Sequence, residues 1–329
     1  MSNPIEISII VPLYNEEPNV DQLFKRISSV LKPLNLTYEI ICVDDGSRDN
    51  TLIKLIDYHQ YYPEIKVIGL SRNFGKEIAL TAGIDYAQGN AVIPIDADLQ
   101  DPPELIIEMI AKWHEGYDVV YAKRRSRQGE SFLKRLTADG FYRVISNMSR
   151  VSIPRDTGDF RLLDRQVVTA LKKLPERNRF MKGLFAWVGF KQTAIIYDRL
   201  PRYQGKTKWN YWKLWNFALD GITSFSMVPL KIWSYVGVIL SFFAFAYGIF
   251  LIVLTLVAGI DVPGYASLMV TVLFLGGIQL ISLGVIGEYL GRVYEEVKER
   301  PLYLVRECYG VTPTKEIASS PINDPKSSY

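Results

Sequence analysis

The sequence has 329 residues, of which 48% are hydrophobic, and a formal net charge of +3. This length is enough for one globular domain with further segments, and so small a charge gives no argument for a nucleic-acid partner. The two cysteines, Cys42 and Cys308, lie far apart without the spacing of a metal or redox site. We therefore expect reduced thiols without a catalytic role.

The first ninety residues repeat a β-loop-α pattern. Short β-branched runs at 5–13, 38–43 and 65–70 each lead into a polar loop and then a helix-like segment. Apolar strands that alternate with helices predict an α/β fold with a mostly parallel sheet covered on both faces. Ligands of such sheets bind beyond the carboxyl ends of the strands. Tyr14, Asp45 and Asn73 would meet there in one crevice.

The stretch from Ala91 to Glu104 is an apolar run that ends in carboxylates. If the chain stays extended, Asp96 and Asp98 share one face and Gln100 follows in line. Mg²⁺ or Mn²⁺ prefers oxygen ligands and often completes its shell with substrate phosphates. An isolated acidic pair is commonly a solvated turn. Because it shares an edge with the other loops, we favour a nucleotide site.

Basic residues gather at 123–127, after a predicted strand at 118–122, and continue along the following helix. Such a run can be a solvated face, but arginine suits phosphate contacts, and bulk acidic lipid is a further candidate. The segment from Asp156 to Arg161 is interpreted as a polar turn beside the crevice. The Gly-centred basic loop from Arg202 to Lys208 is expected to close over phosphates.

Two runs without charged residues, 232–260 and 262–287, are separated by Asp261 alone. Both exceed the roughly 20 residues that cross a bilayer, so we predict two transmembrane helices rather than buried core helices. The aromatic segment at 209–217 favours a membrane-interface location over core packing. Lysine and arginine flank the runs but are missing from the loop between them, which places both flanks in the cytosol. Met1 to Pro12 shows no signal-peptide pattern.

These observations predict the following organisation: a cytosolic α/β domain with the predicted site at 1–200, a basic flap with interfacial amphipathic helices at 201–231, membrane spans at 232–260 and 265–287 around an outward-facing loop at 261–264, and a cytosolic segment with a flexible tail at 288–329.

Six motifs are combined in this chain: Val11-Pro-Leu-Tyr-Asn-Glu16, Val43-Asp-Asp-Gly-Ser47, Ser71-Arg-Asn-Phe-Gly-Lys76, Asp96-Ala-Asp-Leu-Gln-Asp101, Gly158-Asp-Phe-Arg-Leu-Leu-Asp164 and Arg202-x-x-Gly-x-Thr-Lys-Trp209. Together they resemble family 2 glycosyltransferases, and more narrowly the polyprenyl-phosphate glycosyltransferases, which include bactoprenol glucosyltransferases and dolichol-phosphate mannose synthases. The resemblance covers about residues 5 to 310.

This resemblance implies a Rossmann-like GT-A fold and an inverting, Mg²⁺- or Mn²⁺-dependent transfer of a sugar from a UDP-sugar to a polyprenyl phosphate. Two spans fit the bactoprenol branch and favour UDP-glucose. The protein would be an integral protein of the cytoplasmic membrane, and paired spans could support a homo-oligomer.

The resemblance also implies roles for individual residues. Nucleotide binding falls to Pro12, Tyr14, Glu16, Asp44, Asp45, Asn73, Lys76, Asp96 and Ala97. Metal binding falls to Asp96, Asp98 and Gln100, and acceptor phosphate binding to Arg124, Arg127 and Arg135. Catalytic roles fall to Asp98, Asp159, Arg202 and Lys208. Lys76 departs from the family pattern, in which many relatives carry histidine.

Two other functions compete with this interpretation. A processive polysaccharide synthase is disfavoured because the chain has no Q-x-x-R-W segment and no further spans that could form a pore. A non-catalytic, membrane-tethered nucleotide-binding partner of a flippase is disfavoured by the intact Asp96, Asp98 and basic loop. A phosphate acceptor is already largely ionised near pH 7. We therefore expect Asp159 to orient a substrate rather than to accept a proton.

Overall fold

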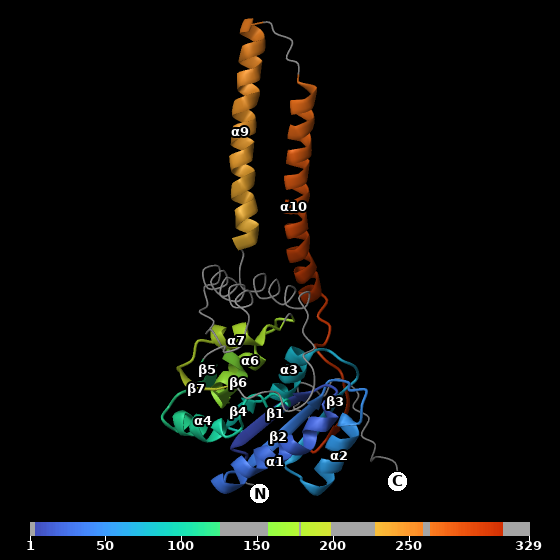
Figure 1. The fold of residues 1–329 in the computed structure, drawn as a ribbon, viewed down its shortest axis with the longest axis vertical. Coiled ribbons are helices and arrows are strands. Elements are labelled where there is room, and N and C mark those ends of the chain that lie inside the picture. Colours follow the sequence, from blue (N-terminus) through green and yellow to red (C-terminus); the bar gives the residue numbers. More distant parts are fainter. Residues whose placement is uncertain (1–3, 126–156, 178, 199–227, 259–263, 312–329) are drawn as a thin grey trace.

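A computed structural model of the chain describes residues 4–125, 157–177, 179–198, 228–258 and 264–311. Within these residues, an eight-stranded sheet has the order β7-β5-β6-β4-β1-β2-β3-β8. Two long helices rise from the globular part (Figure 1). The strands are β1 (Ile7–Leu13), β2 (Tyr38–Asp44), β3 (Ile65–Leu70), β4 (Ala91–Pro94), β5 (Val119–Arg124), β6 (Thr157–Asp164), β7 (Gln192–Tyr197) and β8 (Val305–Tyr309).

The middle of the sheet is parallel, as the sequence predicts. Strand β1 pairs in parallel with β2 on one side and with β4 on the other, and β2 continues in parallel to β3. The helices between these strands are α1 (Val20–Leu31), α2 (Thr51–Tyr61) and α3 (Lys76–Tyr86), and α4 (Leu105–His114) follows β4. Short 3₁₀ turns, η1 (Glu17–Asn19) and η2 (Lys32–Leu34), flank α1.

Strand β6 corrects one prediction. The described part of the segment expected to be a polar turn, Thr157 to Arg161, is instead buried strand. It lies between β4 and β5 and is antiparallel to both. Glycine and aspartate are poor strand formers, but pairing on both sides overrides that local preference. The same edge of the sheet also holds β7, which is parallel to β5.

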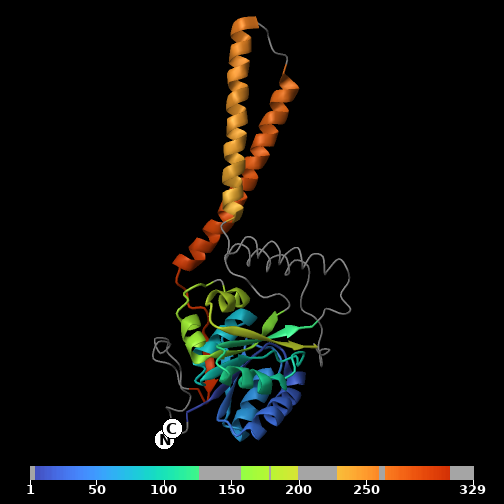
Figure 2. The same cartoon turned by 90° about the vertical axis from the view of Figure 1, so that its left-hand side faces the viewer.

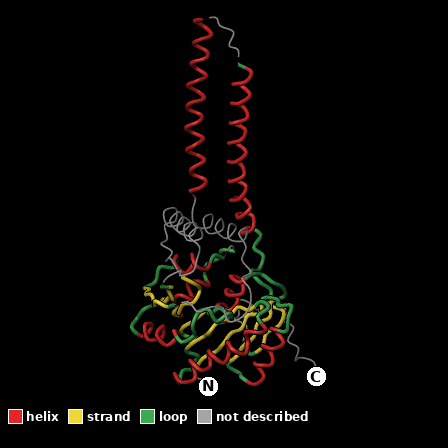
Figure 3. Tube along the Cα trace, in the orientation of Figure 1, coloured by secondary structure: helices red, strands yellow, loops and turns green. Residues whose placement is uncertain are grey.

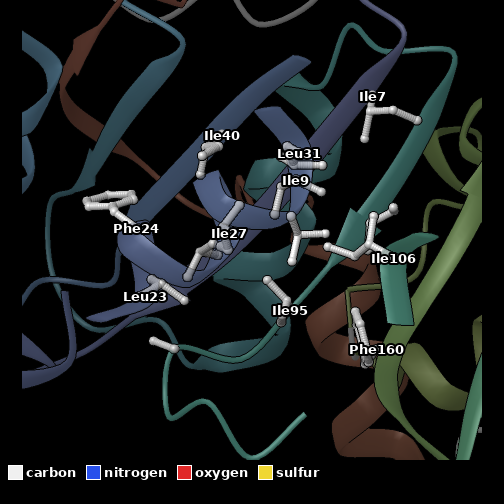
Figure 4. Close-up of a cluster of buried hydrophobic side chains, with 14 of the residues drawn as sticks. Ile7, Ile9, Leu23, Phe24, Ile27, Leu31, Ile40, Ile95, Ile106 and Phe160 are labelled. Atoms are coloured by element: carbon white, nitrogen blue, oxygen red, sulfur yellow. The ribbon is translucent and has the colours of Figure 1, made fainter. Parts of the chain in front are cut away.

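Two helical layers cover the sheet, as Figures 1 and 3 show. Helices α1, α2 and α4 pack on one face, where the core includes Leu23, Ile27 and Ile106. Figure 4 shows these side chains packed against Ile9 and Ile40 of the strands. On the other face, toward the two long helices, lie α3, α6 (Arg165–Lys172) and α7 (Met181–Trp187). The expected helices on both faces are therefore present.

The two long helices are α9 (Val228–Ala258) and α10 (Tyr265–Val297). Stretches of 22 and 30 residues within them are apolar enough to cross a membrane, and neither stretch is buried inside the protein. Helix α10 continues beyond the charge-free run that ends at Gly287. Its last turns carry an ion pair between Arg292 and Glu288 at 2.9 Å, and Figure 2 shows this end approaching the globular part.

Strand β8 is an element that the sequence analysis does not anticipate. It follows α10 and pairs antiparallel with β3, so the chain returns from the hairpin to the far edge of the sheet. The connection is fastened by Tyr303, whose hydroxyl donates to Asp85 at 2.9 Å, and by Glu296, whose carboxylate accepts from the Arg177 amide at 2.8 Å. The hairpin and the globular part are thus joined at several points.

Candidate active site

The loops after β1 and β2 are held together by hydrogen bonds. The amide of Asn15 donates to Ser47 Oγ at 2.9 Å, and the amide of Arg48 donates to Asn15 Oδ1 at 2.8 Å. Asn15 has a positive φ of 52°, a conformation that asparagine tolerates better than most residues. Both loops leave the carboxyl ends of parallel strands, where ligands of such sheets bind.

Asp45 connects the second loop to the third. Its carboxylate accepts hydrogen bonds from the amides of Phe74 at 2.7 Å and Gly75 at 2.9 Å. Burial raises the pKa of Asp45, and these two amides oppose that shift without cancelling it. The close approach of the loops requires Gly46, because a Cβ there would lie 2.5 Å from the Arg72 carbonyl carbon and the residue has a φ of +66°.

The other predicted nucleotide residues surround this link. Asp44 is buried and accepts from the Ser47 amide at 3.0 Å, and burial raises its pKa. Pro12 pairs with Val43 in the sheet, and Tyr14 and Glu16 follow in the next loop. Glu16 Oε2 accepts from the Asn19 amide side chain at 2.6 Å. Asn73 is exposed in the third loop. All of them lie at the carboxyl edge of the sheet.

The acidic loop follows β4, which ends at Pro94. The chain turns at Ala97 and Asp98 instead of staying extended. Exposure still alternates: Asp96, Asp98 and Gln100 are partly exposed, whereas Ile95, Ala97 and Leu99 are buried. The Gln100 amide donates to Asp98 Oδ1 at 3.2 Å, which stabilises the turn.

These side chains can hold a divalent cation only as an open site. Among the described residues, no group of three or more histidine, cysteine, aspartate or glutamate side chains could hold a metal ion without other ligands. Two neighbouring carboxylates nevertheless fit a cation that takes its remaining oxygens from water and a substrate diphosphate. Asp96 and Asp98 would be its protein ligands, and Gln100 stays a predicted third.

Lys76 lies between two acidic residues. It is the first residue of α3, and its Nζ lies 2.6 Å from Asp96 Oδ1 and 2.6 Å from Asp159 Oδ2. The contact joins the loop after β4 to strand β6, so the predicted catalytic Asp159 does reach the predicted metal and nucleotide residues. Although burial works against the ammonium charge, both carboxylates favour it, and the pKa of Lys76 is raised.

Asp159 is almost completely buried among cations. Burial raises the pKa of its carboxyl, but Lys76, Lys182 and Arg161 outweigh that effect and hold the pKa well below its ordinary range. Arg161, on the same strand, donates to the Gly158 carbonyl at 2.8 Å and stacks over the Phe185 ring at 4.1 Å. Asp159 is therefore ionised under all ordinary conditions.

Glu77 is a neighbouring acid that the sequence analysis does not single out. Its Oε2 accepts from the Met181 amide at 3.2 Å, which joins α3 to α7. Burial and the charge of Asp159 raise its pKa to about 7. No sequence signal marks this residue, because the pairing of α3 with α7 is a tertiary feature.

Arg124 is the predicted acceptor-phosphate residue that the described chain contains. Its Nε lies 3.5 Å from the Tyr197 hydroxyl, which in turn donates to Asp101. A Cβ on Gly158 would lie 3.6 Å from the Arg124 guanidinium, so Arg124 is next to the Asp159 strand. Sequence analysis missed Tyr197, whereas Asp101 and Arg161 lie within motifs that it identified. The other predicted residues, Arg127, Arg135, Arg202 and Lys208, lie outside the described residues.

Comparison with known proteins agrees with this geometry. Residues 8–171 match the family described as "Glycosyl transferase family 2", and residues 228–293 match the "GtrB C-terminal hairpin". An uncharacterized glycosyltransferase of Synechocystis sp. is 68% identical over 93% of this chain and 96% of its own length. The "SfII prophage-derived bactoprenol glucosyl transferase" of Shigella flexneri is 47% identical over 94% of this chain and 100% of its own length.

One solved structure shows a more distant likeness. A glucosyl-3-phosphoglycerate synthase from Mycobacterium tuberculosis, solved with Mn²⁺, uridine-diphosphate-glucose and phosphoglyceric acid, is 18% identical with a TM-score of 0.47, covering 67% of this chain and 78% of that one. A likeness of this size carries no conclusion about ligands. The sequence matches are decisive: this chain is a membrane-bound member of glycosyl transferase family 2 that carries the GtrB C-terminal hairpin.

Proposed function

We propose that this glycosyltransferase transfers glucose from UDP-glucose to a polyprenyl phosphate, with inversion, at the cytosolic surface of the membrane. The observation that carries the proposal is full-length similarity, through both the globular part and the hairpin, to proteins named bactoprenol glucosyl transferases. The described site supports it, because acidic and basic side chains from neighbouring strands and from the loops after them lie at one edge of the sheet.

The two substrates are both anions, so the site has to bring together a sugar diphosphate and a lipid monophosphate. A divalent cation bound at Asp96 and Asp98 would neutralise the charge that develops on the departing diphosphate. Asp45 and the loop that it fixes would bind the nucleoside. Arg124 would orient the acceptor phosphate behind the anomeric carbon, since a guanidinium can make two parallel hydrogen bonds to a phosphate.

Asp159 acts in this proposal as an orienting group. A single displacement by a phosphate oxygen inverts the anomeric centre, and the acceptor phosphate, with a second pKa of about 6, is already largely ionised at neutral pH. A base is therefore not required. The depressed pKa of Asp159 supports this role, because a carboxylate held ionised by neighbouring cations is a weak proton acceptor.

The test is the transfer of label to lipid. Membranes that contain the protein are incubated with radiolabelled UDP-glucose, Mg²⁺ or Mn²⁺ and undecaprenyl phosphate, and the organic extract is counted. We expect the label to enter a lipid only when the metal ion is present, and we expect mild acid to release that label as glucose. Label in a water-soluble polymer would instead indicate a polysaccharide synthase. Nucleotide binding without any transfer would indicate a non-catalytic partner.

A parallel screen resolves the donor. UDP-galactose, UDP-N-acetylglucosamine and GDP-mannose replace UDP-glucose at equal concentration. We expect UDP-glucose to give the highest kcat/KM, because similar proteins from Shigella flexneri and Shigella phage SfV are named bactoprenol glucosyl transferases. A preference for another donor would keep the reaction type and change its sugar.

A further inference from the structure

Lys76 forms an ion pair with the Asp96 carboxylate, which is one of the two predicted metal ligands. Its ammonium lies within 2.8 Å of both oxygens of Asp96 as well as 2.6 Å from Asp159. The Lys76 side chain is 43% exposed and that of Asp96 is 27% exposed, so solvent and ions reach this pair. A cation entering at Asp96 must therefore share the carboxylate with Lys76 or displace it.

Within the part of the chain that the structure describes, the charges around this pair nearly cancel. Among the described residues, the cations that act on Asp96, Asp101 or Asp159 are Lys76, Arg124, Arg161 and Lys182. The acids of the same cluster are Asp96, Asp98, Asp101 and Asp159, together with Glu77, whose pKa is raised. A divalent cation would leave this cluster with excess positive charge. The diphosphate of a nucleotide sugar is a dianion and would remove that excess.

We infer that Lys76 competes with the metal ion for the Asp96 carboxylate. Lys76 keeps its ion pair with Asp96 until the donor diphosphate binds, and cation binding therefore depends on the nucleotide. When the cation takes Asp96, Lys76 keeps its contact with Asp159 and frees a donor for a phosphate oxygen. The inference deepens the proposed metal-dependent transfer, on which it rests.

The test measures Mn²⁺ binding rather than turnover. The full-length protein, purified in detergent, is titrated with Mn²⁺ with and without saturating UDP, and free Mn²⁺ is read by electron paramagnetic resonance. For the wild type we expect weak binding that UDP tightens. For Lys76→Met we expect Mn²⁺ to bind at least about tenfold more tightly in the absence of UDP. The reason is that a cation in contact with a carboxylate lowers the pKa of that carboxyl group by about one unit or more, and a competing cation of this strength is removed in the variant. The increase in Mn²⁺ affinity that UDP produces should be smaller in this variant than in the wild type.

Lys182→Met is the matched control. Lys182 also acts on Asp159, so this variant removes the same charge from the same cluster while leaving the Lys76 contact with Asp96 in place. We expect its Mn²⁺ affinity to stay near that of the wild type. Unchanged Mn²⁺ affinity in Lys76→Met, equal tightening in Lys182→Met, or a wild-type protein that binds Mn²⁺ equally well without UDP would overturn the inference.

Lys76→Arg keeps the test decisive if Lys76→Met does not fold. Arginine retains the positive charge and donates two parallel hydrogen bonds to a carboxylate. We therefore expect the Mn²⁺ affinity of this variant without UDP to be equal to or lower than that of the wild type. Tighter Mn²⁺ binding by Lys76→Arg would contradict competition by charge. Because the readout needs no glucose transfer, a negative result leaves the proposed reaction standing, and a failed transfer assay leaves this measurement valid.

Discussion

In the part of the sheet formed by β1 to β4, most polar residues of the candidate site lie in the loops after the strands, whereas in the part formed by β5 to β7 they lie within the strands. Asp45 and Asp96 belong to the first kind, and Arg124, Asp159 and Arg161 belong to the second. A loop carboxylate can be paired with backbone amides and solvent. A charged side chain inside a strand has to be matched by other buried charges, which explains the dense ion pairing around Asp159.

The largest expected effect is on a residue of the β1 to β4 part, where the site residues lie in loops. Asp96→Asn removes the charge of a predicted metal ligand, and we expect glucose transfer to fall about a thousandfold at saturating UDP-glucose. The lipid-labelling assay measures it. Asp21→Asn is a suitable control, because this carboxylate, 62% exposed, also pairs with a lysine but lies on α1. Wild-type transfer by Asp96→Asn, or by the wild type in excess chelator, would contradict the metal site.

The second-largest expected effect is on a residue of the β5 to β7 part, where the site residues lie within strands. Asp159→Asn should lower kcat about a hundredfold and leave the pH profile of the residual activity unchanged. The pKa of Asp159 is depressed, so its stabilising charge is present above about pH 4 and is lost only on further acidification. The acidic limb should instead reflect the acceptor phosphate, near pH 6. If that limb moved in the variant, Asp159 would be the proton acceptor after all.

The two parts also differ in how much could be predicted from the sequence. Strands 38–43 and 65–70 and the helix from Val20 to Leu31 were predicted within one residue of their observed bounds, because each β-loop-α unit is local in the chain. The convergence of four loops followed from the rule for parallel sheets. By contrast, Thr157–Arg161 was predicted as a turn, because its strand character depends on β4 and β5, which no local pattern reveals.

A third prediction tests the contact between loops. Gly46→Ala adds a Cβ against the Arg72 backbone at a φ of +66°, so we expect UDP to bind about ten- to a hundredfold more weakly, which calorimetry can measure. Gly116→Ala is the matched control, since Gly116 also has a positive φ, +87°, but no atom lies within 4 Å of the position that its Cβ would take. Wild-type UDP affinity in Gly46→Ala, or an equal loss of affinity in both variants, would contradict a role for the loop contact.

Tyr197→Phe should have a smaller effect and should act on the acceptor side alone. It removes the hydroxyl that lies between Arg124 and Asp101, so we expect the KM for undecaprenyl phosphate to rise about three- to tenfold with the KM for UDP-glucose unchanged. Tyr58→Phe serves as the control, because its hydroxyl donates to Asp21 at 2.8 Å on the surface. A rise in the KM for UDP-glucose instead would place Tyr197 on the donor side.

The smallest expected effect is on stability. With its pKa raised to about 7, Glu77 contributes most below its ordinary pKa of about 4.5, and that contribution is lost as the pH rises through 7. Glu77→Gln should therefore gain about 1–2 kcal/mol relative to the wild type between pH 5 and pH 8, measured as a difference in Tm. A difference that stays constant with pH would mean that Glu77 is already ionised in the folded protein.

The residues of the candidate site show a further limit of sequence patterns. Asp96 and Asp98 could be singled out from the sequence, because their spacing coincides with the end of a strand whose loop shares an edge with three other polar loops. Glu77 and Tyr197 carry no such signal, since each matters through one partner distant in sequence, Met181 and Asp101 respectively. The pairing of Lys76 with two acids likewise depends on β6 lying beside β4.

Strand β8 has a consequence for biosynthesis. It completes the β3 edge, and the amide of Ser71 at that edge donates to the Leu304 carbonyl at 2.9 Å. Because the ribosome makes β3 more than two hundred residues before β8, that edge lacks its partner for on the order of ten seconds or longer at about 5–20 residues per second. An open edge invites pairing with other chains. We therefore expect the nascent enzyme to need protection until both spans have entered the bilayer.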